Sequence, residues 1–118
     1  MPSKRVFIDS VTLRNTYRVY KSGNNYVVRQ TTEKHKIQTF EYLVRAENVR
    51  RVGRLFEGTE LTIRELANYL EAHSGEFTLD YTYGYKLYYV AEHILLVLCA
   101  LGRAEVEREG RGFIFRLA

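Results

Sequence analysis

The chain has 118 residues, of which 46% are hydrophobic and 27% charged, values typical of a folded domain and not of a disordered chain. This length allows one domain with an ordinary hydrophobic core and leaves little room for a second. The longest uninterrupted apolar run, residues 94–101, is far shorter than the roughly 20 residues that span a bilayer. Because residues 1–9 also contain no apolar signal region, we expect a cytoplasmic protein without a membrane partner.

Residues that commonly carry chemistry are few and scattered. Cys99 is the only cysteine, which excludes an intrachain disulfide and a cysteine-based zinc cluster. His35, His73 and His93 lack metal-ligand spacing, and the chain has no phosphate-binding glycine loop. We therefore expect no metal, no cofactor and no enzymatic activity. A composition rich in Arg, Glu and Tyr but poor in Gln, Met and Cys is also compatible with a thermophilic source.

Charge is divided unevenly between the two halves of the chain. The formal net charge is +4, yet residues 1–56 hold twelve Lys and Arg against four Asp and Glu. Residues 57–118 hold six against ten, so the N-terminal half is strongly basic and the C-terminal half acidic. A concentrated positive surface indicates a polyanionic partner, most often nucleic acid.

Residues 11–32 predict a β-hairpin. Apolar side chains alternate with polar ones in its first strand and share one face: Val11, Leu13, Tyr17 and Val19. Residues 22–25 supply a turn that tolerates positive φ, and a short strand at 6–8 could precede the hairpin. Arg14 and Arg18 on the polar face are candidates for phosphate contacts. The alternative is a solvated face that protects an edge strand.

The segment from Lys36 to Phe56 predicts one long helix that could bend near Gly53, where glycine costs about 1 kcal/mol relative to alanine. Its apolar residues fall within one helical arc: Ile37, Phe40, Leu43, Val44, Val52, Leu55 and Phe56.

Basic residues of this predicted helix differ in their expected partners. Glu41 with Arg45, and Glu47 with Arg51, have the favourable i,i+4 spacing for ion pairs. No acidic residue stands four positions before Arg50 or Arg54, so these two arginines are better placed to contact phosphate. The candidates for contacting DNA in this segment are Arg50, Arg51 and Arg54.

A second, shorter helix is well delimited. Gly58 suits a left-handed position after the preceding helix, and Thr62 with Glu65 forms the pattern of a capping box. The buried face should consist of Ile63, Leu66, Ala67 and Leu70, with Ser74 and Gly75 at the end. In the following segment, residues 76–85, Phe77 and Leu79 could be buried and Asp80 or Thr82 could cap the next helix.

The last third of the chain predicts a helix followed by a β-hairpin. The helical face consists of Leu87, Val90, Ala91, Ile94, Leu95, Leu98 and Leu101. Alternating strands at 104–108 and 113–117 flank a turn at 109–112. Three further apolar residues lie off the main helical stripe: Leu96, Cys99 and Ala100. They should be covered either by the N-terminal hairpin or by a second copy, and we expect a homodimer with these three at its interface.

Two segments resemble the winged helix-turn-helix superfamily. LTIRELANYLEAHSG is similar to its second helix, and VLCALGRAEVEREGRGFIFRL is similar to the end of its third helix and the wing. The resemblance implies an α+β winged helix, with three helices and a C-terminal β-hairpin wing, preceded by an N-terminal β-hairpin extension. The whole chain would be one domain, with the extension at 1–34 and the winged-helix core at 35–118.

The resemblance also implies where DNA would bind. The exposed side of the third helix would enter a major groove, and the wing turn would reach the backbone or minor groove. The corresponding positions here are Tyr85, Lys86, Tyr89 and His93 on the helix, and Arg108 and Arg111 in the wing.

Two features depart from the family pattern. The segment between the second and third helices is long and aromatic, and the wing carries Glu105, Glu107 and Glu109, which would repel phosphate. We expect a small transcriptional regulator that binds double-stranded DNA, with phosphate contacts mainly from the basic N-terminal half. The alternative is a winged-helix module for protein interaction or assembly that does not bind DNA directly.

Overall fold

The computed structural model describes residues 4–32, 38–79 and 85–118. These residues form an α+β structure with three α-helices and two antiparallel sheets. In chain order the elements are β1 (Arg5–Thr12), β2 (Thr16–Ser22), β3 (Asn25–Thr32), β4 (Gln38–Val44), α1 (Ala46–Leu55), β5 (Glu60–Leu61), α2 (Ile63–Ala72), a 3₁₀ turn (Ser74–Glu76), α3 (Tyr85–Ala100), β6 (Ala104–Glu109) and β7 (Gly112–Leu117).

The N-terminal part is a four-stranded sheet in the order β1-β2-β3-β4. The predicted hairpin is confirmed for β2 and β3, whose turn places Gly23 at φ +60°. Its first strand, however, is two strands: the chain reverses after Thr12, so that Val11 pairs with Tyr17 across β1 and β2. The period-2 alternation continues in phase through this short reversal, which is why alternation alone did not reveal it.

The prediction of one helix over residues 36–56 is wrong, because residues 38–44 form strand β4 and the helix begins only at Ala46. Phe40 and Leu43 have helical spacing, but they remain 43% and 51% exposed. Pairing with β3 overrides this local pattern. Glu41 accordingly accepts hydrogen bonds from Arg29 and Arg5 at 2.7 and 2.6 Å, and the expected i,i+4 pair with Arg45 does not form.

Gly53 does not interrupt α1, which continues to Leu55. It marks a close approach between helices instead, since a Cβ atom placed there would lie 3.4 Å from Leu98 Cδ2 of α3. The left-handed conformation predicted for Gly58 is confirmed at φ +74°, and its amide donates to the carbonyl oxygen of Leu117 at 2.9 Å.

Helix α2 agrees with its predicted start and buried face. The amide of Glu65 donates to Thr62 Oγ1 at 3.1 Å, and the amide of Thr62 donates to Glu65 Oε1 at 2.9 Å, which completes the capping box. All four apolar residues expected on its inner face are buried. Phe77 and Leu79 pack partly against the core, whereas Asp80 and Thr82 lie outside the described residues.

The C-terminal helix and hairpin are confirmed. Strands β6 and β7 pair around a turn in which Gly110 has φ +61°, and β5 adds to β7 to make a second sheet in the order β5-β7-β6. Phe115 and Leu117 of β7 and Ala104 of β6 face the core.

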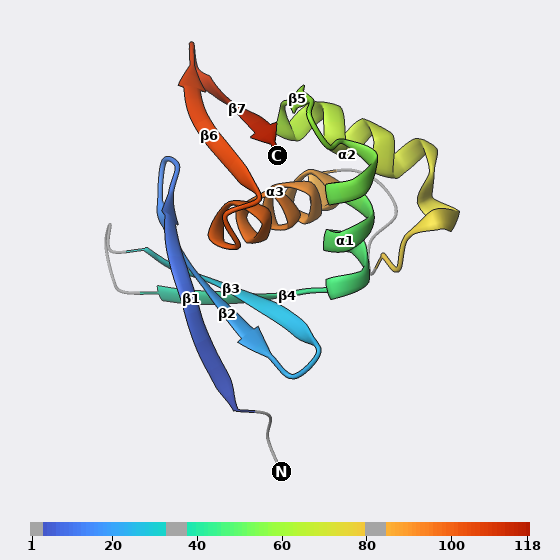
Figure 1. The fold of residues 1–118 in the computed structure, drawn as a ribbon. Coiled ribbons are helices and arrows are strands. Elements are labelled where there is room, and N and C mark those ends of the chain that lie inside the picture. The colour runs from blue at the N-terminus through green and yellow to red at the C-terminus, as the bar shows by residue number, and fades with distance from the viewer. Residues whose placement is uncertain (1–3, 33–37, 80–84) are drawn as a thin grey trace.

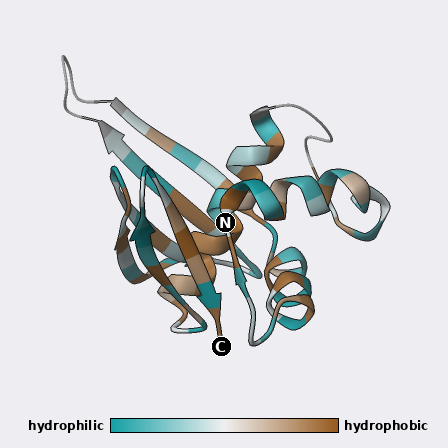
Figure 2. Cartoon of the chain, turned by 90° about the horizontal axis from the view of Figure 1, so that it is seen from above, coloured by the Kyte–Doolittle hydropathy of each residue, from teal (hydrophilic) through white to brown (hydrophobic). Residues whose placement is uncertain are grey.

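Helix α3 lies at the centre of the molecule, with the four-stranded sheet on one side and α1, α2 and the second sheet on the other (Figure 1). Strands and outer helices mix hydrophobic and hydrophilic residues, as expected of elements with one buried face (Figure 2). Leu96 is 0% exposed and Ala100 is also buried within this single chain, while Cys99 is half-buried. Leu96 and Ala100 are thus covered within the single chain, without a second copy, and the homodimer stays a prediction.

Candidate binding cleft

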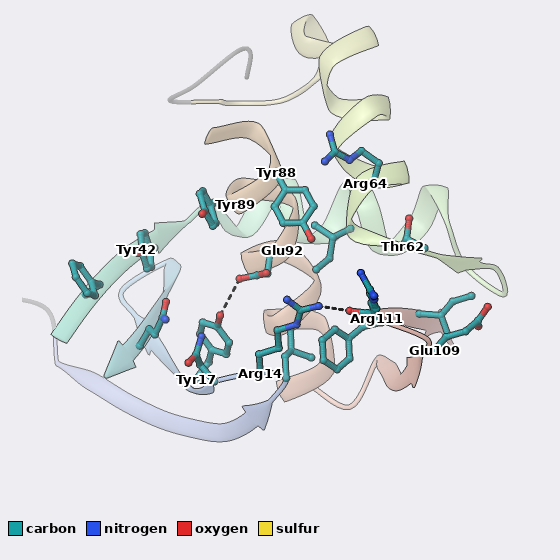
Figure 3. A pocket seen from close by; sticks show the side chains of 18 residues that line it. Arg14, Tyr17, Tyr42, Thr62, Arg64, Tyr88, Tyr89, Glu92, Glu109 and Arg111 are labelled. Carbon is teal, nitrogen blue, oxygen red and sulfur yellow. Dashed lines mark hydrogen bonds between the residues drawn. The ribbon is translucent and has the colours of Figure 1, made fainter. Parts of the chain in front are cut away.

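A cleft of about 750 Å³ lies between the two sheets, above the side of α3 that the core leaves uncovered (Figure 3). Its walls come from four separate parts of the chain: the β1–β2 turn, strands β2 to β4, the start of α2 and the tip of the β6–β7 hairpin. The side chains used below are Arg14, Tyr17, Tyr42, Thr62, Arg64, Tyr88, Tyr89, Glu92, Glu109 and Arg111. We call this the α3 cleft.

Glu92 occupies the middle of the α3 cleft and is half-buried (Figure 3). The hydroxyl of Tyr17, on the inner face of β2, donates to Glu92 Oε1 at 3.1 Å. Burial raises the pKa of the Glu92 carboxyl above its ordinary value, although the Tyr17 bond opposes that rise. Burial, followed by the neighbouring Glu92 charge, raises the pKa of Tyr17 to about 12. The pair therefore places a partly desolvated carboxyl at the centre of the site.

Three arginines lie around the cleft. Arg14 in the β1–β2 turn donates to the carbonyl oxygen of Arg111 in the β6–β7 turn, which connects the two sheets at one end of the cleft. Arg64 of α2 places its guanidinium 5.3 Å from the centre of the Tyr88 ring. None of the three forms an ion pair with a carboxylate of the described chain. Glu109 also lines the cleft, so its charge is mixed, with arginines in excess.

Tyrosine rings form the other wall. Tyr88 and Tyr89 meet edge to face with ring centres 6.0 Å apart, and Tyr89 is exposed. Tyr42 of β4 stacks on His93 at 4.1 Å. Tyr42 and Tyr89 also line a second cavity of about 510 Å³ beyond them, to which Lys86 contributes. These rings offer flat apolar surfaces directly beside basic side chains.

The residues predicted to contact DNA do not form one surface. Arg14, Tyr89 and Arg111 meet at the α3 cleft, and Lys86 lines the neighbouring cavity. Exposed positions elsewhere hold the remaining described candidates: Arg50, Arg51 and Arg54 on α1, Arg18 on the outer face of the four-stranded sheet, and Arg108 in β6. The side chain of Tyr85 lies outside the described residues.

His93 is the predicted contact that the structure contradicts. It is only 5% exposed, because it faces β4 and stacks on Tyr42. Burial lowers its pKa to about 4. A neutral, covered imidazole cannot reach a phosphate or a base edge.

Sequence reasoning missed five residues of the cleft: Tyr17, Tyr42, Arg64, Tyr88 and Glu92. A signal was available for two of them, since Tyr88 and Glu92 are four residues apart and both lie off the predicted apolar stripe of α3. Nothing local indicated Tyr42, because the segment around it has helical spacing. Arg64 lies in the first turn of α2, where the local sequence pattern gives it no role beyond that of an exposed helix residue.

Some kinds of site find no support among the described residues. No group of three or more His, Cys, Asp or Glu side chains is placed to hold a metal ion there. Burial raises the pKa of Cys99 to about 12, so its thiol is a poor nucleophile near neutral pH. Within the same residues no helix has both the length and the hydrophobicity needed to cross a membrane.

The described residues form a mixed α+β structure with a cleft lined by arginine and tyrosine side chains over its central helix. Comparison of the chain with protein-family models, with curated proteins and with solved structures found no match.

Proposed function

We propose that this chain is a DNA-binding protein of the winged-helix type, a small transcriptional regulator that binds double-stranded DNA through phosphate contacts from its basic N-terminal half. The observation that carries the proposal is the surface of α1. Arg50, Arg51 and Arg54 are all exposed, and none forms an ion pair with a described carboxylate. Three such guanidinium groups on one rigid helix suit a phosphate backbone.

The ion pairs elsewhere make this surface distinctive. Arg5 and Arg29 are held by Glu41, and Arg116 is held by Glu60 and Glu107. By contrast, Glu47 makes no ion pair with Arg51, whose guanidinium instead lies 5.8 Å from the centre of the Phe77 ring. The α1 arginines therefore keep their charge available for an external anion.

The C-terminal part adds further support. Three helices followed by a β-hairpin, the order behind the winged-helix resemblance, occur at residues 46–117. Lys86 and Tyr89 of α3 and Arg108 and Arg111 of the hairpin are exposed, as DNA contacts must be. The acidity of the hairpin is reduced by the Arg116 bond to Glu107 at 2.6 Å. Phosphate repulsion from the wing is thus weaker than its three glutamates imply.

Fluorescence anisotropy with a labelled random-sequence duplex, repeated over a series of salt concentrations, tests the proposal. The slope of log affinity against log salt should be steep. The triple variant Arg50→Ala, Arg51→Ala and Arg54→Ala should flatten it by about 2.7, the value for three lost phosphate contacts. Arg116→Ala is the matched control, because this exposed arginine already has carboxylate partners. Affinity independent of salt, or a slope that the triple variant leaves unchanged, refutes the proposal.

A second candidate function, a protein-interaction or assembly module, is favoured by the outer face of the four-stranded sheet. Phe7, Tyr20, Val27 and Leu43 form one row across its four strands. Phe7 and Leu43 at the two ends are about half exposed, and Phe7 meets Tyr20 edge to face at 5.5 Å. Val27 in the middle of the row is buried, so the exposed apolar surface lies at Phe7 and Leu43, and exposed apolar side chains of this kind can mark an interaction surface.

Light scattering at micromolar concentration distinguishes the two candidates. If the outer row joins two copies, the mass should be that of a dimer, and Phe7→Glu with Leu43→Glu should convert it to a monomer. A dimer that shows no affinity for duplex DNA would favour the assembly module. A monomer that binds DNA would exclude both the assembly-module hypothesis and the predicted homodimer.

A further inference from the structure

The α3 cleft is not explained by duplex binding through α1. Its volume of about 750 Å³ falls within the 300–1,000 Å³ typical of small-molecule sites. The Arg14 contact with Arg111 joins the two turns at its edge, so the space suits a ligand the size of a nucleotide and not a whole duplex. The question is which ligand chemistry its walls would recognise.

One end of the α3 cleft is suited to an anion. Arg14 and Arg111 come from two different turns and meet at this end, each without an ion pair to a described carboxylate, whereas Arg64 lies beside Tyr88. Figure 3 shows Arg14 and Arg111 together on one side of Glu92. Guanidinium groups converging in this way are the usual protein partners of phosphate.

The opposite end is suited to a flat aromatic ring. Tyr42 and Tyr89 lie on the other side of Glu92 from the two arginines, with Tyr88 adjoining (Figure 3). Tyrosine rings stack on nucleobases with a gain of about 1–3 kcal/mol for each base. Phosphate chemistry at one end and stacking at the other indicate a nucleotide.

Between the two ends, Glu92 can select the base. Its Oε1 accepts from Tyr17, while its Oε2 has no hydrogen-bond donor among the described side chains and backbone amides. Oε2 is not buried, so it is accessible from the cleft, where a ligand N–H group can donate to it. Guanine presents two adjacent donors, N1–H and the N2 amino group. Adenine presents an acceptor, N1, beside its one amino group.

We propose that the α3 cleft binds a guanine nucleotide, with the base against Tyr42, Tyr88 and Tyr89, its N1–H and N2 amino group donating to Glu92, and its phosphate held by Arg14 and Arg111. The same unit occurs as free guanosine monophosphate and as an unpaired guanosine within a nucleic acid strand. The site is separate from the α1 arginines and does not depend on duplex binding.

Isothermal titration of the full chain with guanosine monophosphate, adenosine monophosphate and guanosine at low salt tests this assignment. The guanine nucleotide should bind at least about tenfold more tightly than the adenine nucleotide, because a two-donor contact is worth about 1–3 kcal/mol of discrimination. Guanosine, without phosphate, should bind more weakly than its monophosphate. Equal affinity for the two nucleotides, or no heat at millimolar concentration, overturns the proposal whatever the behaviour of any variant.

Two variants assign the roles of the side chains. Glu92→Gln should bring the ratio of guanine to adenine affinity close to one, with Glu105→Gln, an exposed acidic residue outside the cleft, as its control. Arg111→Ala should weaken the monophosphate but not guanosine, with Arg108→Ala as its control. Selectivity that survives Glu92→Gln in a folded protein, judged by circular dichroism, refutes the assigned contact.

Titration with an oligonucleotide distinguishes a free nucleotide from a nucleotide within a strand. A short oligothymidine strand with one central deoxyguanosine is titrated beside the all-thymidine strand and the free monophosphate. Tighter binding of the guanosine-containing strand than of either comparator identifies a strand, whereas tighter binding of the monophosphate identifies a free ligand. The variant lacking Arg50, Arg51 and Arg54 should keep its guanine selectivity, so failure of duplex binding and failure of this site are distinguishable.

Discussion

Two neighbouring residues of α3, Glu92 and His93, show how burial changes the chemistry of single side chains. Both face the four-stranded sheet, where Tyr17 bonds one and Tyr42 stacks on the other. Desolvation favours the neutral form of each, so it raises the pKa of the acid and lowers that of the base. As the pH rises, the contribution of His93 to stability therefore increases and that of Glu92 decreases.

His93 should make the folded state sensitive to acid. Its pKa falls from 6.5 in the unfolded chain to about 4 in the folded one, so between these values only the unfolded chain takes up the proton. Stability is complete above pH 6.5 and should fall by up to about 3 kcal/mol as the pH approaches 4. Urea unfolding at pH 5 and pH 7 measures this loss.

The variant His93→Phe isolates the effect, because it keeps a ring against Tyr42 and removes the titration. Glu92 acts in the other direction, since a raised pKa makes its contribution decline as the pH rises above the ordinary value of 4.5. Because both proteins contain Glu92, its contribution cancels in the difference between their free energies of unfolding. An identical pH dependence in both proteins would contradict the buried neutral imidazole.

At the scale of elements, local pattern and long-range pairing compete, and the outcome differs along the chain. Helix α2 carries its own start signal in Thr62 and Glu65 and agrees with expectation. Strand β4 carries helical spacing but pairs with β3 over its full length. Backbone hydrogen bonds from a neighbouring strand and the burial of Val44 outweigh a weak local preference.

Helix α1 allows a test of how closely it packs against α3. A Cβ at Gly53 would lie 3.4 Å from Leu98 Cδ2, which is an ordinary contact distance, and the backbone there has no need of positive φ. Gly53→Ala should therefore stabilise the protein by up to about 1 kcal/mol through helix propensity. Gly53→Leu should instead destabilise it by about 1–3 kcal/mol, because the larger side chain has no space against α3. Thermal unfolding of the two variants checks both signs, and a loss of stability in Gly53→Ala would show that the helices lie closer together.

At the scale of the molecule, the N-terminal sheet is part of the core. Val19 and Val28 of the sheet belong to the same buried cluster as Leu66 of α2 and Phe115 of β7, with α3 between them. The extension predicted at 1–34 therefore covers the central helix, and it also supplies one wall of the α3 cleft.

A shared core predicts a single cooperative unfolding transition. Among the described residues the sheet packs mainly against α3, so neither part keeps its packing once the other is lost. Far-ultraviolet circular dichroism reports backbone structure, and tyrosine fluorescence reports tertiary packing in a chain that has ten tyrosines and no tryptophan. The midpoints of the two denaturation curves should coincide. Separate midpoints would show that the sheet unfolds independently.

By itself the sequence determined the elements whose signals are local. The capping box at Thr62, the helix up to Ala100 and the turn at Gly110 depend on residues a few positions apart, and all three are confirmed. The excess of basic charge before residue 57 is likewise a property of the sequence alone.

Only the tertiary structure decided the properties that depend on distant partners. It placed residues 38–44 in a strand, because β3 offered hydrogen bonds that no local pattern reveals. Packing of α3 beneath the same sheet buried His93, and it brought Arg14 to Arg111 across 97 positions of sequence. Periodicity indicates which side of an element is buried. Long-range packing decides which elements face each other. The α3 cleft forms between elements that this packing brings together.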